Sequence, residues 1–157
     1  MPIDVEYIPN EDYVFRQISM FYFKEWENKR PNETDFLPDP DGLSVNWEKY
    51  CDLEQCFVLL GLTKNRNNPE KYIDPTTYKA IKLNVGVLRQ IKTINDSNVD
   101  VIHNPLDGND SHSLIIYTDE DDDVRLELCE LVHKNYDEMV LKPDFKAVTK
   151  KLKELRT

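Results

Sequence analysis

Glycine is scarce in this sequence, which contains four glycines among 157 residues. No glycines have the spacing of the phosphate-binding loops GxGxxG or GxxxxGK[ST], so both fingerprints are absent. These loops hold the phosphates of nucleotides in Rossmann and P-loop proteins. A nucleotide-binding function of either type therefore loses most of its support.

Cysteine is also rare, and its pattern excludes the usual roles of clustered cysteines. The three residues are Cys51, Cys56 and Cys129, an odd number without a CxxC pair. This pattern argues against a disulfide framework and against a tetrahedral zinc site. Cys56 and Cys129 lie in apolar runs, where a free thiol behaves as a small hydrophobic group. We therefore expect a reducing compartment, no metal and no cofactor.

Long apolar runs are missing as well. The longest run is far shorter than the roughly 20 residues that a helix needs to cross a bilayer. The initial stretch MPIDVEYIPNEDY is acidic and lacks the apolar centre of a signal peptide. The sequence thus predicts a cytoplasmic protein without a membrane segment.

Basic residues are fewer than acidic ones: the sequence has 20 Lys and Arg and 30 Asp and Glu, which gives a formal net charge of −10. A surface of this sign repels a nucleic-acid backbone, so we expect no nucleic-acid partner. A basic protein is the more natural partner, although solubility alone also explains an acidic surface. The densest acidic run, Asp119–Asp123, is explained by the positive end of the helix predicted after it.

The apolar residues form clusters with strand-like and helix-like spacing. With 39% hydrophobic residues, a chain of 157 residues is long enough for one folded domain with its own core. Strands are predicted at 11–26, 43–51, 77–85, 97–106 and 111–118, and helices at 52–62, 85–94, 118–136 and 144–156. This order predicts an α+β fold in which short helices pack on a small mixed or mainly antiparallel sheet.

Polar residues mark where the predicted helices begin. The side chains expected to cap them are Asp52, Asn84, Thr118 and Asp144, and Asp121 completes a capping box with Thr118. Pro143 interrupts the chain just before the last helix. We therefore expect residues 1–142 to form a single domain. Residues 143–157 are expected to form an amphipathic C-terminal helix that either docks on this domain or projects toward a partner.

The stretch VIHNPLDGNDSHSLIIY contains two of the three histidines, His103 and His112. Pro105, Asp107 and Gly108 favour a turn between two strands, so the histidines are predicted to face each other across a loop of about eight residues. Such a pair could divide acid and base roles, clamp an anion or share a metal. A metal requires further ligands, which the spacing does not supply, so no metal site is predicted. Alternatively, the histidines hold the loop by bonding backbone carbonyls.

Two further polar residues lie in settings that suggest chemistry. Arg16 is enclosed by apolar residues in YVFRQI, and a buried arginine requires a carboxylate partner or a bound anion. Ser44 follows a turn predicted at Pro40–Gly42, and without a GxSxG elbow it can act as a nucleophile only with a base beside it. The alternatives are an arginine that points to solvent and a hydroxyl that caps the turn.

Several motifs together resemble a family of small bacterial proteins. The matching stretches, from about Tyr13 to Tyr117, are VFRQI, DPDGLSVNWEKY, LNVGVLRQI, VIHNPL and NDSHSLI, with Phe36 and Pro38 in the intervening loop. The resemblance implies a bacterial origin and a grouping of polar residues, and it implies no particular activity. Within this group, Arg89 and Asn104 are our candidates for binding a ligand. The FR of the first strand is also similar to small NAD-consuming toxins of the RES and ADP-ribosyltransferase type. Their Gly-Arg-Trp-Asn element and catalytic glutamate have no counterpart here.

Two functions follow from these features. The first expectation is an interaction module, such as an immunity protein, an antitoxin-like protein or a subunit of an antiviral defence complex. The acidic surface, the aromatic N-terminal segment and an exposed C-terminal helix favour it. The alternative is a small toxin-like enzyme acting on a nucleotide or NAD, in which Arg16 grips phosphate and His103 or His112 is the acid or base. That enzyme requires Arg16, Ser44, Arg89, His103 and His112 to converge in one concave pocket.

Overall fold

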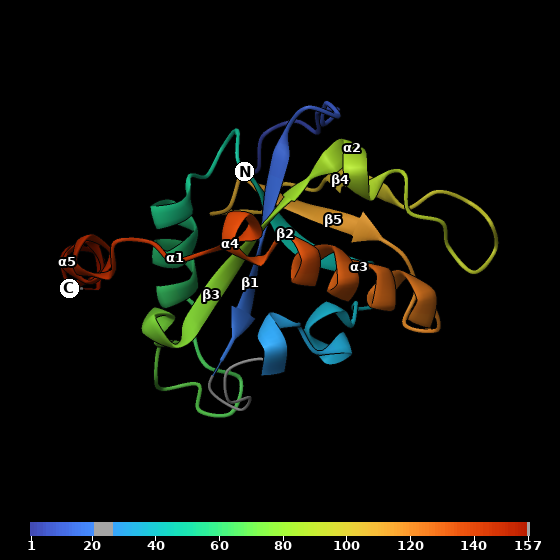
Figure 1. Cartoon of the computed structure of the whole chain (residues 1–157). Helices are drawn as coiled ribbons and strands as arrows, with labels where there is room; N and C mark the ends of the chain where they lie inside the picture. Colours follow the sequence, from blue (N-terminus) through green and yellow to red (C-terminus); the bar gives the residue numbers. More distant parts are fainter. Residues whose placement is uncertain (21–26, 157) are drawn as a thin grey trace.

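The computed structural model describes residues 1–20 and 27–156, which contain one six-stranded sheet (Figure 1). The strands lie in the order β4-β5-β2-β1-β3-β6, and every neighbouring pair is antiparallel. Helices pack on the sheet, and the last of them, α5, lies near the C-terminus. The α+β fold class that the sequence predicts is therefore confirmed.

The strands and helices have the following bounds. The strands are β1 (Tyr13–Ser19), β2 (Leu43–Trp47), β3 (Tyr78–Asn84), β4 (Asp100–His103), β5 (His112–Ile116) and β6 (Val140–Leu141). The helices are α1 (Leu53–Gly61), α2 (Val85–Leu88), α3 (Asp122–Lys134), α4 (Tyr136–Met139) and α5 (Phe145–Leu155), with 3-10 turns η1 (Glu27–Lys29), η2 (Glu33–Phe36) and η3 (Pro75–Thr77). The end of the first predicted strand, 21–26, lies outside the described residues. In the described part of the chain, no helix has both the length and the apolar character of a membrane span.

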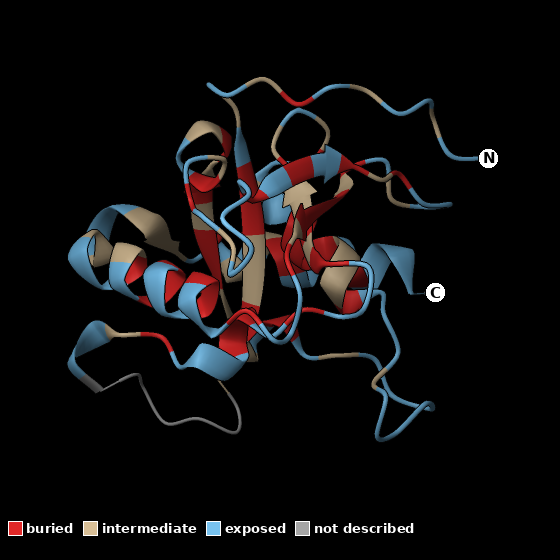
Figure 2. Cartoon of the chain, turned by 90° about the vertical axis from the view of Figure 1, so that its right-hand side faces the viewer, coloured by how far each residue is buried: buried red, intermediate tan, exposed pale blue. Residues whose placement is uncertain are grey.

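Alternation along the strands divides the apolar side chains between the two faces of the sheet. The face called the α3 face below holds the main core, in which Ile81 and Ile115 pack with Leu128 of α3. The opposite face, called the α1 face, carries Phe15 and Ala80, which lie under α1 and α5. Figure 2 shows that buried positions follow the strands and the inward sides of the helices. Each buried Leu or Ile stabilises the fold by roughly 1.5–3 kcal/mol, so both faces contribute to stability.

Three of the four predicted helix caps are formed. Side-chain oxygens of Asp52, Asn84 and Asp144 accept hydrogen bonds from backbone N–H groups in the first turns of α1, α2 and α5. Each bond satisfies an N–H group that the helix itself leaves without a partner. A cap of this kind stabilises a helix by ~1 kcal/mol.

The fourth predicted cap, Thr118, is wrong. α3 begins at Asp122, and its N-cap residue is Asp121, whose carboxylate makes no bond to the helix. Instead, this carboxylate accepts a hydrogen bond from the Ile94 N–H at 2.9 Å and ties the loop after α2 to the start of α3. The hydrogen bond from Ile94, which is distant in sequence, therefore takes the place of the capping box predicted between Thr118 and Asp121. The helix predicted at 85–94 is also shorter than expected, because α2 ends at Leu88.

The C-terminal helix docks on the domain rather than projecting from it. Val148 and Leu152 of α5 pack with Phe57 of α1 in a buried cluster. The guanidinium of Arg156 donates to the backbone oxygen of Gly61 at the end of α1. Figure 1 shows the two helices side by side on the same side of the sheet. The connection through α4 and β6 was not predicted, because a two-residue strand is too short to show a period.

The predicted turn before β2 is present and depends on Gly42. Asp39 and Gly42 exchange backbone hydrogen bonds of 2.9 and 3.1 Å. Gly42 has φ +127°, and a Cβ atom at this position would lie 2.7 Å from the backbone oxygen of Ile115. Only glycine fits both the positive φ and the close approach of β5. The turn therefore sets the start of β2, and with it Ser44, against β5.

We predict that Gly42→Ala lowers the free energy of unfolding by about 2–3 kcal/mol, since backbone strain and the clash with β5 add. Gly108→Ala is the matched control. Gly108 has φ +79°, but nothing lies within 4 Å of an added Cβ, so the loss should be only about 1 kcal/mol. Urea unfolding measures both values. Equal losses in the two variants would contradict the proposed close contact with Ile115.

Candidate active site

The β4–β5 hairpin forms as predicted, but its two histidines do not face each other. His103 pairs with Ser113 across the strands, and His112 lies one position earlier in β5. Because neighbouring residues in a strand point to opposite faces, this register sends His103 to the α3 face and His112 to the α1 face. The prediction of facing histidines is therefore wrong, since spacing along a loop does not determine the register of the strands beside it.

His103 is a buried structural residue with an exposed fraction of 2%. Its Nδ1 atom accepts a hydrogen bond from the Glu6 N–H at 3.0 Å, so the proton is on Nε2, which donates to the backbone oxygen of Asp110 at 2.7 Å. The ring stacks on Tyr50 and meets Trp47 edge to face. These contacts match the alternative in which a histidine holds the loop by bonding a backbone carbonyl.

His112 of β5, Ser44 of β2 and Asn104 after β4 come together on the α1 face. The Nδ1 atom of His112 lies 2.8 Å from the backbone oxygen of Asn104, and its Nε2 atom lies 3.3 Å from the Ser44 hydroxyl. A carbonyl oxygen can only accept, so Nδ1 carries the proton of the neutral ring and Nε2 presents a lone pair to Ser44. Both side chains are half-buried. Ser44 therefore has beside it the base that nucleophilic chemistry requires.

Gln17 of β1 is a further polar residue near this group. It lies two residues after Phe15, so its side chain belongs to the α1 face that also carries Ser44 and His112, although β1 and β2 no longer pair at this position. The Gln17 Nε2 group is buried and has no hydrogen-bond partner among the described residues. A buried amide donor without a partner is costly, which favours a ligand oxygen at this position. No signal in the sequence distinguishes Gln17 from the other polar residues of its strand.

The sheet opens between β1 and β2 at Arg16. β1 pairs with β3 over seven residues but with β2 only at Val14 and Phe15. The Arg16 guanidinium lies at this opening, where it donates to the backbone oxygen of Ser44 at 3.0 Å and to that of Asp35 at 3.2 and 3.4 Å. Arg16 is thus linked to Ser44 through the main chain, although alternation directs its side chain to the α3 face.

Among the described residues, no side chain of opposite charge lies at contact distance from the Arg16 guanidinium. Arg16 is half-buried, and no carboxylate of the described residues forms an ion pair with it. Burial lowers the pKa of Arg16, while Tyr117 and the carboxylates of Asp35 and Asp39 oppose this shift from longer range. A desolvated guanidinium bonded only to carbonyl oxygens favours an anionic ligand. Of the two partners that the sequence leaves open, a carboxylate is not found among the described residues, and a bound anion stays a prediction.

Arg89 connects the N-terminal segment to the β4 strand through its guanidinium. Its guanidinium donates to the backbone oxygens of Ile8 and Val101 at 2.6 and 2.9 Å. It also bonds the side chains of Tyr7, Asn10 and Asp100. These bonds fasten the N-terminal segment and α2 to the edge strand β4, and they occupy most of the donors that a ligand would need.

The five residues required for the predicted enzyme pocket therefore do not converge. The structure brings Ser44, Asn104 and His112 together and links Arg16 to them through the Ser44 carbonyl. His103 lies on the opposite face of the sheet, and Arg89 lies against the N-terminal segment. The candidate site is consequently smaller than predicted and is centred on β2.

A pocket of about 480 Å³ lies at the end of β1, beyond α1. Ser19 forms part of its wall, and Lys64, Arg66 and Lys71 add positive charge. None of the three cations forms an ion pair with a described acidic side chain. Ser19 is two residues from Gln17 on the same strand, so both belong to the α1 face. This pocket supplies cations on the same face as Ser44 and His112.

Within residues 1–20 and 27–156, no three His, Cys, Asp or Glu side chains are grouped so that they could hold a metal ion. Comparisons of the chain with family models, with curated proteins and with solved structures gave no match. The argument for function therefore depends on the residues of the site.

We predict that the two hairpin histidines have opposite tautomers. In its neutral form, His112 should carry its proton on Nδ1, and neutral His103 should carry it on Nε2. Long-range ¹H–¹⁵N NMR correlations distinguish the two forms in the intact protein. An Nε2 proton on His112 would contradict the arrangement, because that ring could not accept the proton of Ser44.

Proposed function

We propose that the chain is a small enzyme that acts on a nucleotide or on NAD. Its site differs from the five-residue pocket that the sequence required, because His103 and Arg89 lie elsewhere and only Ser44, Asn104 and His112 come together. The observation that carries this proposal is the link from Arg16 to Ser44 to His112 across the adjacent strands β1, β2 and β5. It connects Arg16, which forms no ion pair with a described carboxylate, through the Ser44 backbone oxygen to a residue whose hydroxyl lies beside a general base. The resemblance of the first strand to NAD-consuming toxins supports the same class of substrate.

Each residue has a role in this proposal. A phosphate of the substrate lies against Arg16, at the opening between β1 and β2, where a guanidinium can bind two of its oxygens without a glycine-rich loop. His112 accepts a proton at Nε2 from the Ser44 hydroxyl, whose oxygen attacks C1′ of the nicotinamide ribose of NAD as the bond to nicotinamide breaks and nicotinamide leaves. Alternatively, Ser44 relays to His112 the proton of a water molecule that makes the same attack. The Asn104 carbonyl holds the His112 ring in the required tautomer. Gln17 donates a hydrogen bond to a substrate oxygen.

The basic pocket at the end of β1 supports a substrate with more than one charged group. Outside 142–156 the chain has 14 basic and 28 acidic side chains, a formal charge of −14. This pocket holds three cations that form no ion pair with a described acidic side chain, and one carboxylate, Asp74, also lines it, so its local charge attracts an anion. Arg16 points to the α3 face, so a nucleotide that binds it must pass through the opening between β1 and β2 before its further phosphate oxygens can reach Lys64, Arg66 and Lys71 on the α1 face.

We expect the protein to bind ADP-ribose and to consume NAD. His112→Gln should lower turnover by about 100-fold or more, because a general base is lost. Arg16→Met should weaken ADP-ribose binding by about tenfold or more, because a charge-assisted phosphate contact is lost. Calorimetry measures binding, and chromatography of NAD and its products measures turnover.

The matched control is His133→Gln, which changes an exposed histidine of α3 and should leave both quantities unaltered. Circular dichroism checks that each variant is folded. A folded wild-type protein that binds neither ADP-ribose nor AMP and leaves NAD intact would contradict the proposal. Ser44→Ala then tests the role of the Ser44 hydroxyl. Turnover should fall in this variant if the hydroxyl is the nucleophile or relays a proton, and should stay unchanged if it does neither.

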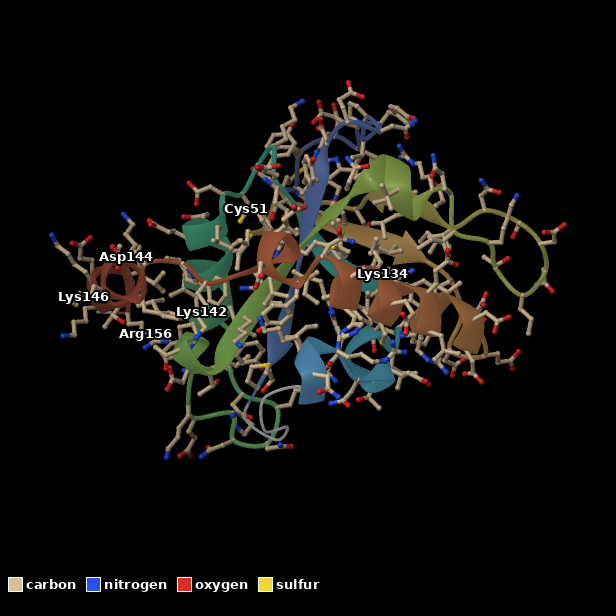
Figure 3. The ribbon with its side chains drawn as sticks, in the orientation of Figure 1. Cys51, Lys134, Lys142, Asp144, Lys146 and Arg156 are labelled. Carbon is tan, nitrogen blue, oxygen red and sulfur yellow. The ribbon has the colours of Figure 1, made fainter. Side chains whose placement is uncertain are left out.

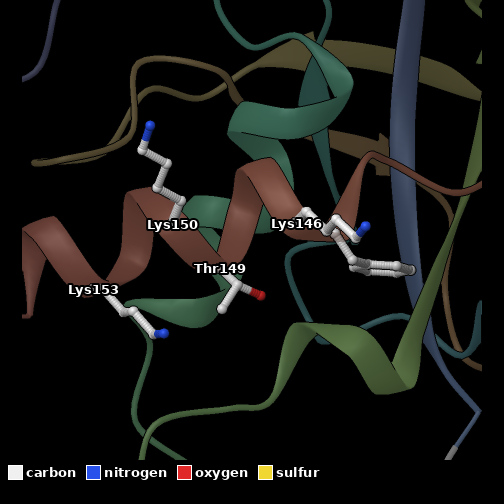
Figure 4. Close-up of a pocket in the computed structure, with 5 residues that line it drawn as sticks. Lys146, Thr149, Lys150 and Lys153 are labelled. Carbon is white, nitrogen blue, oxygen red and sulfur yellow. The ribbon is translucent and has the colours of Figure 1, made fainter.

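A second candidate function is the interaction module with a basic protein partner. The observation in its favour is the separation of charge, because 142–156 carries six basic and two acidic side chains and the remaining residues carry the charge of −14. On α5, Lys146, Lys150 and Lys153 line a pocket on the exposed side (Figure 4). Two features that favoured the module are weaker in the structure, since α5 is docked and Phe15 is buried.

For this second candidate we predict a salt-sensitive complex with a basic protein encoded by a neighbouring gene. Gel filtration of the purified pair should show one peak at low salt and two at high salt. Changing Asp119 and Asp123 to Lys should abolish the complex, whereas changing Lys146 and Lys150 to Glu should preserve it. Separate peaks for every neighbouring basic protein at low salt would count against the module.

A further inference from the structure

Cys51 and Cys56 form a close pair of thiols at the start of α1. Their Sγ atoms lie 3.0 Å apart, and both residues are buried, with exposed fractions of 3% and 0%. Cys51 lies where the chain enters α1 (Figure 3), just before the N-cap residue Asp52. Cys56 is in the first turns of the same helix and faces the sheet, where both cysteines pack with Phe15.

The geometry of the pair follows from the way the helix begins. Cys51 lies between the turn at 48–50 and the N-cap residue Asp52, and its thiol is directed at that of Cys56 in the helix. Cys56 lies on the inner side of the helix, and its thiol is 3.8 Å from the Cys51 carbonyl oxygen. The Sγ atoms are therefore only about one ångström farther apart than the ~2.05 Å of a disulfide bond. A small rotation of the side chains closes this distance.

We propose that Cys51 and Cys56 are a site of reversible oxidation, at which a small-molecule disulfide such as oxidised glutathione converts the two thiols to an intramolecular disulfide. Both thiols stay reduced in the reducing compartment that the sequence predicts. The proposal does not depend on the proposed enzyme activity. Cys129 is also buried, but neither of the other cysteines contacts it.

The reaction proceeds by two exchanges. The Cys51 thiolate attacks one sulfur of oxidised glutathione, which releases one glutathione thiolate and leaves a mixed disulfide on Cys51. Cys56 then loses its proton to solvent and attacks the Cys51 sulfur, which releases the second glutathione. In total, two protein thiols and one oxidised glutathione become one protein disulfide and two reduced glutathiones.

The electrostatics assign the order of attack. A hydrogen bond from the Cys56 thiol lowers the pKa of Cys51, against the effect of burial, and a bond from Ser111 acts in the same direction. The shared hydrogen bond and burial raise the pKa of Cys56. Since the thiolate is the nucleophile, Cys51 attacks first and Cys56 resolves the mixed disulfide. The buried position of both sulfurs means that the first turn of α1 must open to admit the oxidant.

The test equilibrates the whole protein in buffers with different ratios of reduced to oxidised glutathione, starting from reduced native protein and, separately, from reduced protein refolded out of urea. Acid quenching, alkylation and peptide mass spectrometry then locate each disulfide. We expect a Cys51–Cys56 disulfide and an alkylated Cys129 from both starting points. The native pair should oxidise at a ratio about tenfold more reducing than the same pair in urea.

Variants make the result specific. Cys129→Ser should leave the oxidation unchanged, whereas Cys51→Ser and Cys56→Ser should each abolish the intramolecular disulfide. Cys56→Ser should instead accumulate the glutathione adduct on Cys51. Three alkylated cysteines at every ratio after refolding, or a disulfide that includes Cys129, would overturn the proposal. So would oxidation of the native pair at the same ratio as in urea, because folding would then not bring the thiols together.

Discussion

The register of the β4–β5 hairpin is the constraint on which the candidate site depends. It pairs His103 with Ser113 and so turns two histidines of one loop to opposite faces of the sheet. Burial favours this register, because His103 fills a place between Tyr50 and Trp47 and satisfies two backbone groups. A shift of one residue would bury His112 and expose His103. The core on the α3 face thus determines which histidine is available for chemistry.

The second constraint is the opening of the sheet between β1 and β2. Strand pairing there stops after two residue pairs, and Arg16 supplies hydrogen bonds to the carbonyl oxygens of Ser44 and Asp35. A neutral donor could satisfy these oxygens at a lower desolvation cost than a cation. The presence of arginine at this position therefore indicates that its positive charge has a further role, such as binding an anion. An anion at the opening would contact Arg16 from one side and lie near Ser44 and His112 on the other.

Local features of the fold could be predicted from the sequence, whereas those that depend on tertiary contacts could not. The caps at Asp52, Asn84 and Asp144 and the turn at Gly42 are encoded within a few residues, and all are present. The start of α3 that the sequence predicts is wrong, because the Asp121 carboxylate accepts a hydrogen bond from the distant Ile94 and not from its own helix. In the same way, the loop spacing predicted the hairpin correctly but left its register open, and the pair Cys51–Cys56 does not have a CxxC spacing. Ser44 and His112 are 68 positions apart, so their contact required the whole sheet.

The most direct test of the central claim is a crystal structure of the protein with ADP-ribose bound. The account predicts phosphate oxygens within hydrogen-bond distance of the Arg16 guanidinium at the opening between β1 and β2. It also predicts the adjoining ribose near the Ser44 hydroxyl and Nε2 of His112. A ligand bound only on the lysines of α5, with Arg16 still bonded solely to the carbonyl oxygens of Ser44 and Asp35, would contradict it.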